Sequence, residues 1–193
     1  MLIPSDVGLT GLSTETPNRL VIDAGKITAG FTDPDNPGID VGATRGGSRF
    51  NLEREIREIP VDGVMGPTMG LRRRSRVLAT IETNAMEVFP NNIERFVAGA
   101  DVDDGDPDFT VITGGPVEDG DYVVNLALIG TIHGNDLPFV GMVLNALPES
   151  PLTIPLAPQD EAVIAAKWTG HFDPANPYVE PWELWIPADI SGS

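Results

Sequence analysis

The sequence contains no cysteine. This absence excludes disulfide bridges, zinc sites built on thiolates and cysteine nucleophiles. Only two histidines are present, His133 and His171, so the side chain most used for acid–base catalysis and metal binding is scarce. Catalysis and metal binding that depend on these two residue types are therefore disfavoured.

Long apolar runs are also missing. No run in the 193 residues approaches the roughly 18–20 residues of a membrane-spanning helix, and the opening MLIPSDVGLTGLSTETPNR lacks the basic-then-apolar order of a signal peptide. We therefore expect a protein that is folded and used without export and has no membrane partner. The length suits one domain better than two very small ones, and we place an N-terminal arm at 1–18, a β-domain at 19–187 and a C-terminal tail at 188–193.

Basic side chains are few and unevenly placed. The net charge of −17 disfavours a conventional duplex-binding role, because such proteins gain most of their affinity by neutralising phosphates. Residues 44–76 nevertheless carry eight of the twelve basic side chains against four acidic ones, a local +4, while residues 101–193 carry sixteen acidic side chains and only Lys167, a local −15. Two interpretations stay open: complementarity between copies of the chain, or a solvated acidic surface with a basic hairpin.

Turn-forming residues, in contrast, are abundant. Eighteen prolines and twenty-one glycines separate short apolar runs, a pattern typical of a mainly β domain. The first strand, at 19–31, could also be a broken hairpin. Further strands are predicted at 76–86, 108–113, 122–132, 139–147, 151–157, 162–172 and 182–187.

Three of these segments carry a more specific expectation. The run 122–132 is apolar on both faces, which predicts a strand at the centre of a sheet or between two layers. The apolar residues of 139–147 also allow a helix. The clearest helix is predicted within 90–101, with Asn91 or Asn92 as its cap and Gly99 where it stops.

The stretch TRGGSRFNLEREIREIPVDG at 44–63 fits two structures. Leu52, Ile56 and Ile59 have helical spacing, supported by i,i+4 pairs of Glu and Arg. Phe50, Leu52 and Ile56 also share one face of an extended strand. The residues alone leave both structures open.

Candidate chemical sites are few. The segment DVDDGDPD at 101–108 is either a solvated acidic turn or an oxygen-rich calcium loop, although its spacing does not fit an EF-hand. His133 and His171 end different predicted strands, and nothing in the sequence joins them into a catalytic or metal-binding pair. The G-x-S-x-G, P-loop and H-E-x-x-H motifs are absent. We therefore predict no enzyme, no catalytic residue, no cofactor and no metal site.

A glycine-rich loop, VDGVMGPTMGLR at 61–72, follows the ambiguous stretch. It mixes Gly and Pro with Val64, Met65 and Met69, and a triple arginine at 72–74 lies at its base. Apolar residues at the tip of a long hairpin are costly to leave in water and often mark a contact with another chain. This loop is therefore a candidate interaction surface.

These features resemble the major tail tube proteins of bacteriophages with long, non-contractile tails (siphophages). The similarity is carried by GATRGGSRFNLEREIREIPVDGVMGPTMGLRRRSRVLATIETNAMEV at 42–88, where a Gly-Gly pair, an Arg-Glu-Ile run, a glycine-rich loop and a basic segment precede a strand and a helix. It extends to KWTGHFDPANPYVEPWEL at 167–184, with a closing strand, an Asp-Pro turn and a final strand. The two segments cover about a third of the chain.

The resemblance implies a single-domain β-sandwich or barrel with one flanking α-helix and a long hairpin loop, and an extended chain from Glu53 to Ile59. Subunits of that family form hexameric rings that stack into a tube. The resemblance places an inter-ring loop at Val61, Asp62, Gly63, Val64, Met65, Gly66, Pro67, Thr68, Met69, Gly70 and Leu71. It places subunit-interface charges at Arg54, Arg57, Arg72, Arg73, Arg74 and Arg76.

The resemblance also implies partners and a location. The partners are other copies of the chain, a tape-measure protein, a tail terminator and distal tail proteins, and the location is the virion tail, assembled in the host cytoplasm. Double-stranded DNA would pass through the tube without specific binding, because an acidic lumen repels phosphates. We further expect the arginines at 72–76 to pair with acidic surfaces of adjacent subunits, such as the 101–108 loop.

Two alternatives stay open. One is the tube protein of a related bacterial secretion apparatus, which is similar in fold and ring symmetry. The other is a β-sandwich binding module that recognises a protein or glycan through its loops, with a calcium loop at 101–108.

Overall fold

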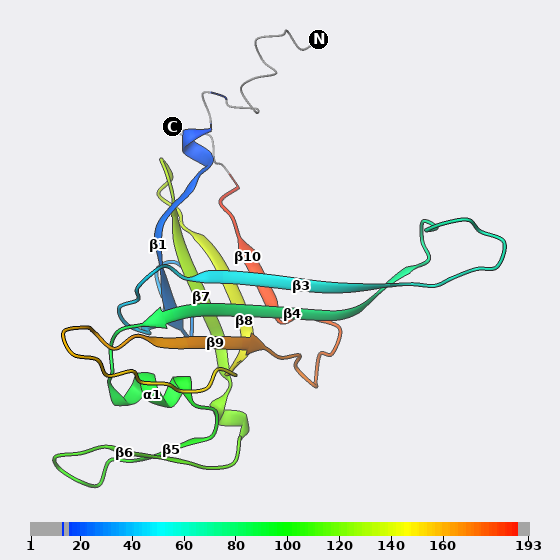
Figure 1. Cartoon of the computed structure of the whole chain (residues 1–193). Coiled ribbons are helices and arrows are strands. Elements are labelled where there is room, and N and C mark those ends of the chain that lie inside the picture. The colour runs from blue at the N-terminus through cyan, green and yellow to red at the C-terminus, as the bar shows by residue number, and fades with distance from the viewer. Residues whose placement is uncertain (1–12, 14–15, 189–193) are drawn as a thin grey trace.

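The computed structural model describes residue 13 and residues 16–188. In chain order the elements are η1 (Pro17–Arg19), β1 (Val21–Ala29), β2 (Ile39–Asp40), β3 (Arg49–Glu58), β4 (Arg72–Ala85), α1 (Pro90–Phe96), β5 (Ala100–Asp103), β6 (Val111–Gly114), η2 (Asp119–Asp121), β7 (Val123–Ile132), β8 (Phe139–Pro148), β9 (Ile164–Gly170) and β10 (Trp182–Trp185). Strands dominate, and α1 is the α-helix of this described part (Figure 1). The mainly β fold with one flanking helix is confirmed. Most of the expected arm at 1–18 and tail at 188–193 lies outside the described residues.

One antiparallel sheet of eight strands organises the described chain, in the order β2-β1-β7-β8-β9-β4-β3, with β10 joined to β8. The sheet divides at β8, because β10 pairs with residues 140–143 of β8 whereas β9 pairs only with residues 146–148. As a result β1, β7, β8 and β10 form one layer, and β9, β4 and β3 cross it as a second layer (Figure 1). β7 lies between β1 and β8, so the predicted central strand is confirmed.

Apolar side chains from both layers and from α1 fill the space between the layers. β4 contributes Ala79 and Ile81 because alternate residues of a strand face the same side. Trp168 of β9 is fully buried, and its ring centre lies 5.5 Å from that of Phe96. The indole Nε1 of Trp168 donates a hydrogen bond to the carbonyl of Arg95 at 2.9 Å. These contacts hold α1 against the second layer.

The ambiguous stretch forms β3 and not a helix. Phe50 and Leu52 pack against the core between the layers. Farther along the β3–β4 ribbon Glu55 lies across from Arg76 and Glu58 across from Arg72, whereas Arg57 lies across from Arg73. Each opposite-charge pair contributes roughly 0.2–1 kcal/mol, and the like-charge pair is destabilising. The helical spacing is therefore coincidental, because pairing with β4 and burial against the core override local propensity.

Two other segments were open or wrongly predicted. The segment 139–147 forms β8, so its strand interpretation is confirmed and its helical one is wrong. The strand predicted at 151–157 is absent, and the chain there is irregular and exposed. Prolines at 151, 155 and 158 deprive this segment of the N–H donors that a sheet ladder needs.

The helix is shorter than predicted and is capped differently. α1 ends at Phe96 rather than near Gly99, and Phe89 rather than an asparagine occupies the N-cap, with Pro90 at the first helical position. Pro is favoured there because its missing N–H would have no partner inside the helix. The buried Asn92 instead donates its side-chain amide to the carbonyl of Val41, which fastens α1 to the chain that follows β2.

Candidate functional site

The β3–β4 ribbon projects beyond the two-layered body and ends in the loop 59–71 (Figure 1). Almost every side chain from residue 53 to residue 76 is exposed. An isolated two-stranded ribbon is at best marginally stable in water. The projecting part of the ribbon is therefore a surface that would gain stability when another element packs against it.

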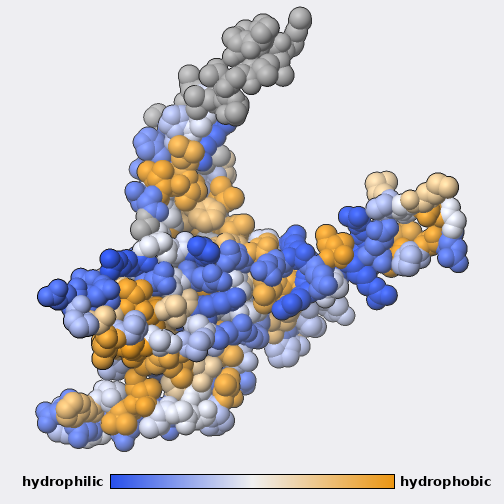
Figure 2. Space-filling model, in the orientation of Figure 1, coloured by the Kyte–Doolittle hydropathy of each residue, from blue (hydrophilic) through white to orange (hydrophobic). Residues whose placement is uncertain are grey.

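The tip of the ribbon, residues 61–71, is a loop with internal backbone hydrogen bonds and exposed apolar side chains. The amide of Val64 donates to the carbonyl of Val61, and the amide of Leu71 donates to the carbonyl of Thr68, so the loop contains two tight turns. Met65 and Met69 are fully exposed, and apolar surface is visible at the ribbon tip in Figure 2. All the residues predicted for the inter-ring loop lie on this tip.

The base of the ribbon is fastened to the body by Glu180, which precedes β10. Its carboxylate forms ion pairs with Arg54 of β3, at 3.0 Å, and with Arg74 of β4. The same carboxylate accepts a hydrogen bond from Trp182 Nε1 at 2.6 Å, and the Arg54 guanidinium lies over the Trp182 ring, 5.1 Å from its centre. Only 13% of the Glu180 side chain is exposed. One carboxylate therefore connects both strands of the ribbon to β10.

The predicted interface arginines consequently fall into two groups. Arg54 and Arg74 are held by Glu180, and Arg72 lies 3.8 Å from Glu58, so these three have partners within the chain. The other three form no ion pair among residues 13 and 16–188: Arg57, Arg73 and Arg76. The second group carries the positive charge that the ribbon has available for a partner.

The acidic segment 101–108 contains most of β5 and the first part of the loop at the tip of the β5–β6 hairpin, which projects on the side of α1 (Figure 1). Its carboxylates shape turns: Asp103 accepts a hydrogen bond from the amide of Gly105, and Asp106 accepts from the amides of Asp108 and Phe109. This is the geometry expected of an acidic turn. Within the described part of the chain no three His, Cys, Asp or Glu side chains are grouped closely enough to hold a metal ion.

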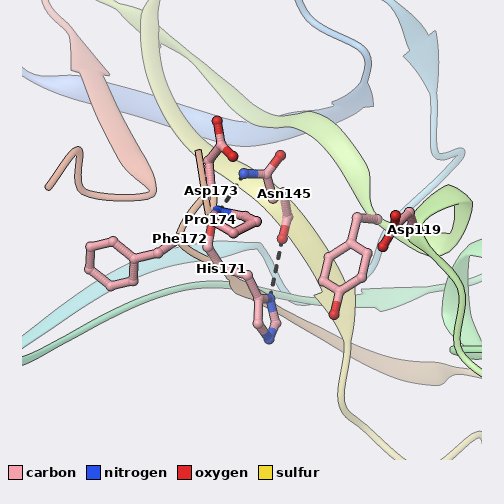
Figure 3. A pocket seen from close by; sticks show the side chains of 7 residues that line it. Asp119, Asn145, His171, Phe172, Asp173 and Pro174 are labelled. Atoms are coloured by element: carbon pink, nitrogen blue, oxygen red, sulfur yellow. Dashed lines mark hydrogen bonds between the residues drawn. The ribbon is translucent and has the colours of Figure 1, made fainter. Parts of the chain in front are cut away.

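The pocket in Figure 3, about 500 Å³ in volume, contains one of the two histidines. His171 Nδ1 lies 3.2 Å from the carbonyl of Asn145, and the side-chain amide of Asn145 donates to the carbonyl of His171. The imidazole also meets the Tyr122 ring edge to face, 5.2 Å between centres. These contacts clip the end of β9 to β8, which is a structural use of His171. His133 is exposed at the end of β7, away from this pocket's lining.

Two Asp-Pro turns share one hydrogen-bond pattern. Asp33 accepts hydrogen bonds from the amide of Asp35 and from the side chain of Asn36, and Asp173 accepts from the amide of Ala175 and from the side chain of Asn176. In both turns the asparagine side chain is the main cause that lowers the pKa of the aspartate below 3.8. These turns have similar sequences, DPDNPG at 33–38 and DPANPY at 173–178, and the similarity is therefore recurring turn chemistry rather than an internal repeat.

We expect Asp173→Asn to weaken the dependence of stability on pH in acid. Because the pKa of Asp173 is lowered in the fold, the unfolded chain binds more protons, so the stabilisation is present above the ordinary pKa near 3.8 and disappears as the pH falls through the folded value. Urea unfolding between about pH 2.5 and pH 6 measures this slope. Asn176→Ala, which removes the amide donor, should also flatten it. A wild-type slope in Asp173→Asn would contradict the prediction.

Comparison with known proteins adds no family to this description. The chain matches no model of a known protein family, and no curated protein matches it in sequence. Among the described residues no helix is long and apolar enough to cross a membrane. The function is therefore argued from the geometry and from the residues themselves.

Proposed function

We propose that the protein is a self-assembling structural subunit of the siphophage tail tube type, whose copies form stacked rings around a channel for double-stranded DNA. The projecting ribbon carries the proposal, because its exposed apolar tip is costly in an isolated monomer and becomes stabilising when a neighbour covers it. In this role the rings are hexameric, and the subunit works in the virion tail. Its further partners are the tape-measure, terminator and distal tail proteins, and it needs no cofactor and performs no catalytic step.

Unpaired strand edges support the same proposal. β3 pairs with β4 on one side and with no strand of the described chain on the other, and β10 likewise has β8 as its strand partner. A long edge strand invites pairing with another chain. The alternating Glu and Arg side chains of β3 disfavour random pairing, because like charges directly opposite each other are destabilising, and they leave pairing with a charge-complementary strand favourable.

The charge distribution supports both assembly and the conduit. The basic ribbon and the acidic second half of the chain have opposite signs, so contacts between copies are attractive where ribbon meets acidic surface. With a net charge of −17, a wall built from many copies repels phosphates, which lets DNA pass without being held. The acidic tip of the β5–β6 hairpin is one acceptor we propose for the ribbon arginines of a neighbour.

Negative-stain electron microscopy of the purified protein, concentrated at low and at moderate salt, tests the proposal. Rings or tubes with a central channel are the expected result. A protein that remains monomeric at all concentrations and salt levels would contradict it. A calcium titration of that monomer would then test the binding-module alternative.

The arginines that form no ion pair within the described chain give a second test. We expect Arg73→Glu to reduce assembly at low salt, because it places a negative charge where the proposal needs a positive one, with a smaller difference from wild type at high salt, where such charges are screened. Arg19→Glu makes the same change of charge far from the ribbon and is the matched control. Sedimentation measures the assembled fraction. Equal assembly of Arg73→Glu and Arg19→Glu at low salt would overturn the electrostatic part of the proposal.

A further inference from the structure

An apolar groove lies where β10 ends. It has a volume of about 420 Å³ and is bounded by the loop after β1, the turn between β7 and β8 and the end of β10. Every lining residue is apolar: Pro34, Leu137, Pro138, Val140, Leu184, Trp185, Ile186, Pro187 and Ala188. The volume is in the range of pockets that bind ligands or side chains, roughly 300–1,000 Å³. Leu137 and Ile186 are more than half exposed, so this surface faces water in the monomer.

Trp185, which forms one wall of the groove, is held in place before any partner binds. The Trp185 ring meets the buried Phe31 ring edge to face, with 5.4 Å between their centres. The indole Nε1 of Trp185 also donates to the carboxylate of Glu183 at 2.8 Å. A fixed aromatic ring lowers the entropy cost of binding, because little ordering is left to be done.

Acidic residues adjoin the lining residues of the groove in the sequence, and we call them its acidic rim. Asp33 and Asp35 flank the lining residue Pro34, Asp136 precedes Leu137, and Glu183 precedes Leu184. The three chain segments that form the groove contain no Lys or Arg. A matching occupant therefore has an apolar end and positive charge beside it.

The ribbon tip has this composition. Met65 and Met69 are fully exposed at its end, and Arg57 and Arg73, which form no ion pair among the described residues, lie beside it. Methionine adapts its shape to irregular apolar sites and makes favourable sulfur–aromatic contacts, which suits a groove with an indole in its wall. The tip cannot be that of the same chain in this conformation, because the ribbon projects away from the end of β10 (Figure 1).

We propose that the groove at the end of β10 receives the ribbon tip of a second copy of this chain. Met65 and Met69 of one copy lie against Trp185 and Ile186 of the other, and the ribbon arginines face the acidic rim. This inference rests on the proposed self-assembly and deepens it, because it pairs two specific surfaces and gives the assembly a direction, from tip to groove.

The chain contains no cysteine, so each introduced cysteine is the only thiol available for a disulfide cross-linking test. A preparation of Met65→Cys is mixed with one of Ile186→Cys that carries a distinguishing tag, assembled, and oxidised mildly. A disulfide forms only when the two Cβ atoms come within about 4.5 Å, so the tagged heterodimer reports contact between tip and groove. We expect about tenfold more of it than of the control mixture of Met65→Cys with Val124→Cys, which places the thiol at an exposed aliphatic position on β7 outside the groove. Met69→Cys is the second tip position.

The outcomes separate the groove from the assembly. Rings or tubes without the heterodimer, from either tip position, would overturn the groove assignment and leave the proposed function standing. A predominant tip-to-tip homodimer, or a stronger cross-link between Leu2→Cys and Ile186→Cys, would assign the groove to another occupant and also overturn the inference. If no variant and no wild-type protein assembles, the proposed function fails and the inference fails with it.

Discussion

Replacing Met65 and Met69 together by serine is expected to abolish assembly while leaving the fold intact. Both side chains are fully exposed in the monomer. Replacing them removes no buried contact, so the free energy of unfolding of the monomer should not change. In an assembly that covers them, each buried methionine contributes about 1.5–3 kcal/mol. Losing both therefore weakens each contact by about 3 kcal/mol or more, which is more than a hundredfold in the association constant.

Two measurements on the same samples check this prediction. Thermal unfolding of the monomer should match wild type, and sedimentation should show no assembled species at concentrations where wild type assembles. Leu156→Ser is the matched control, because Leu156 is an exposed aliphatic residue in the irregular segment outside the ribbon. Normal assembly of the double variant, or an equal loss in Leu156→Ser, would show that the tip is not the contact.

Local sequence patterns correctly predicted the strands whose apolar residues follow the spacing of a strand with one or both faces buried. The run 122–132 is apolar on both faces and forms the central strand β7. The alternation within 76–86 predicted the inner half of β4, although β4 extends back to Arg72. That extension pairs only with β3 and contacts no core, so no apolar alternation marks it.

The two errors have different physical causes. At 151–157 apolar residues alternate with others as in a strand, but the prolines remove the donors needed for pairing. At α1 the capping asparagine was inferred from local preference, whereas Asn92 is used to reach Val41, 51 residues earlier. The first outcome follows from prolines in the segment itself, whereas the second depends on a contact distant in the sequence.

The candidate site shows the same difference between features made by neighbouring residues and features made by residues distant in the sequence. The ribbon tip is contiguous, so its glycine, proline and methionine content identified it from the sequence. Glu180 and the groove at the end of β10 were missed, because they bring together residues from distant parts of the chain: 126 residues separate Glu180 from Arg54. The one available signal was that Glu180 lies within the segment 167–184 that carries part of the resemblance.

Replacing Glu180 by glutamine is expected to loosen the ribbon at its base. The change keeps the size of the side chain but leaves the Arg54 and Arg74 guanidiniums facing each other without the carboxylate between them. Hydrogen bonds to a charged group contribute about 1.5–3 kcal/mol. Because both arginines are about half exposed and can be resolvated, we expect a global destabilisation of only about 1–2 kcal/mol. The effect on the position of the tip is larger, since the ribbon has no other covering element in the described chain.

Hydrogen exchange of the monomer separates these two effects. In Glu180→Gln the amides of β3 beyond residue 53 should exchange about tenfold faster, because a local opening free energy lower by about 1.4 kcal/mol corresponds to that factor, while the amides of β7 in the core should change less. Glu183→Gln is the matched control, because Glu183 also accepts a hydrogen bond from an indole, that of Trp185, but makes no ion pair with the ribbon. Unchanged exchange in β3 of Glu180→Gln would mean that strand pairing alone directs the ribbon. Faster exchange together with weaker assembly would mean that a carboxylate at the start of β10 sets where the tip reaches a neighbouring copy.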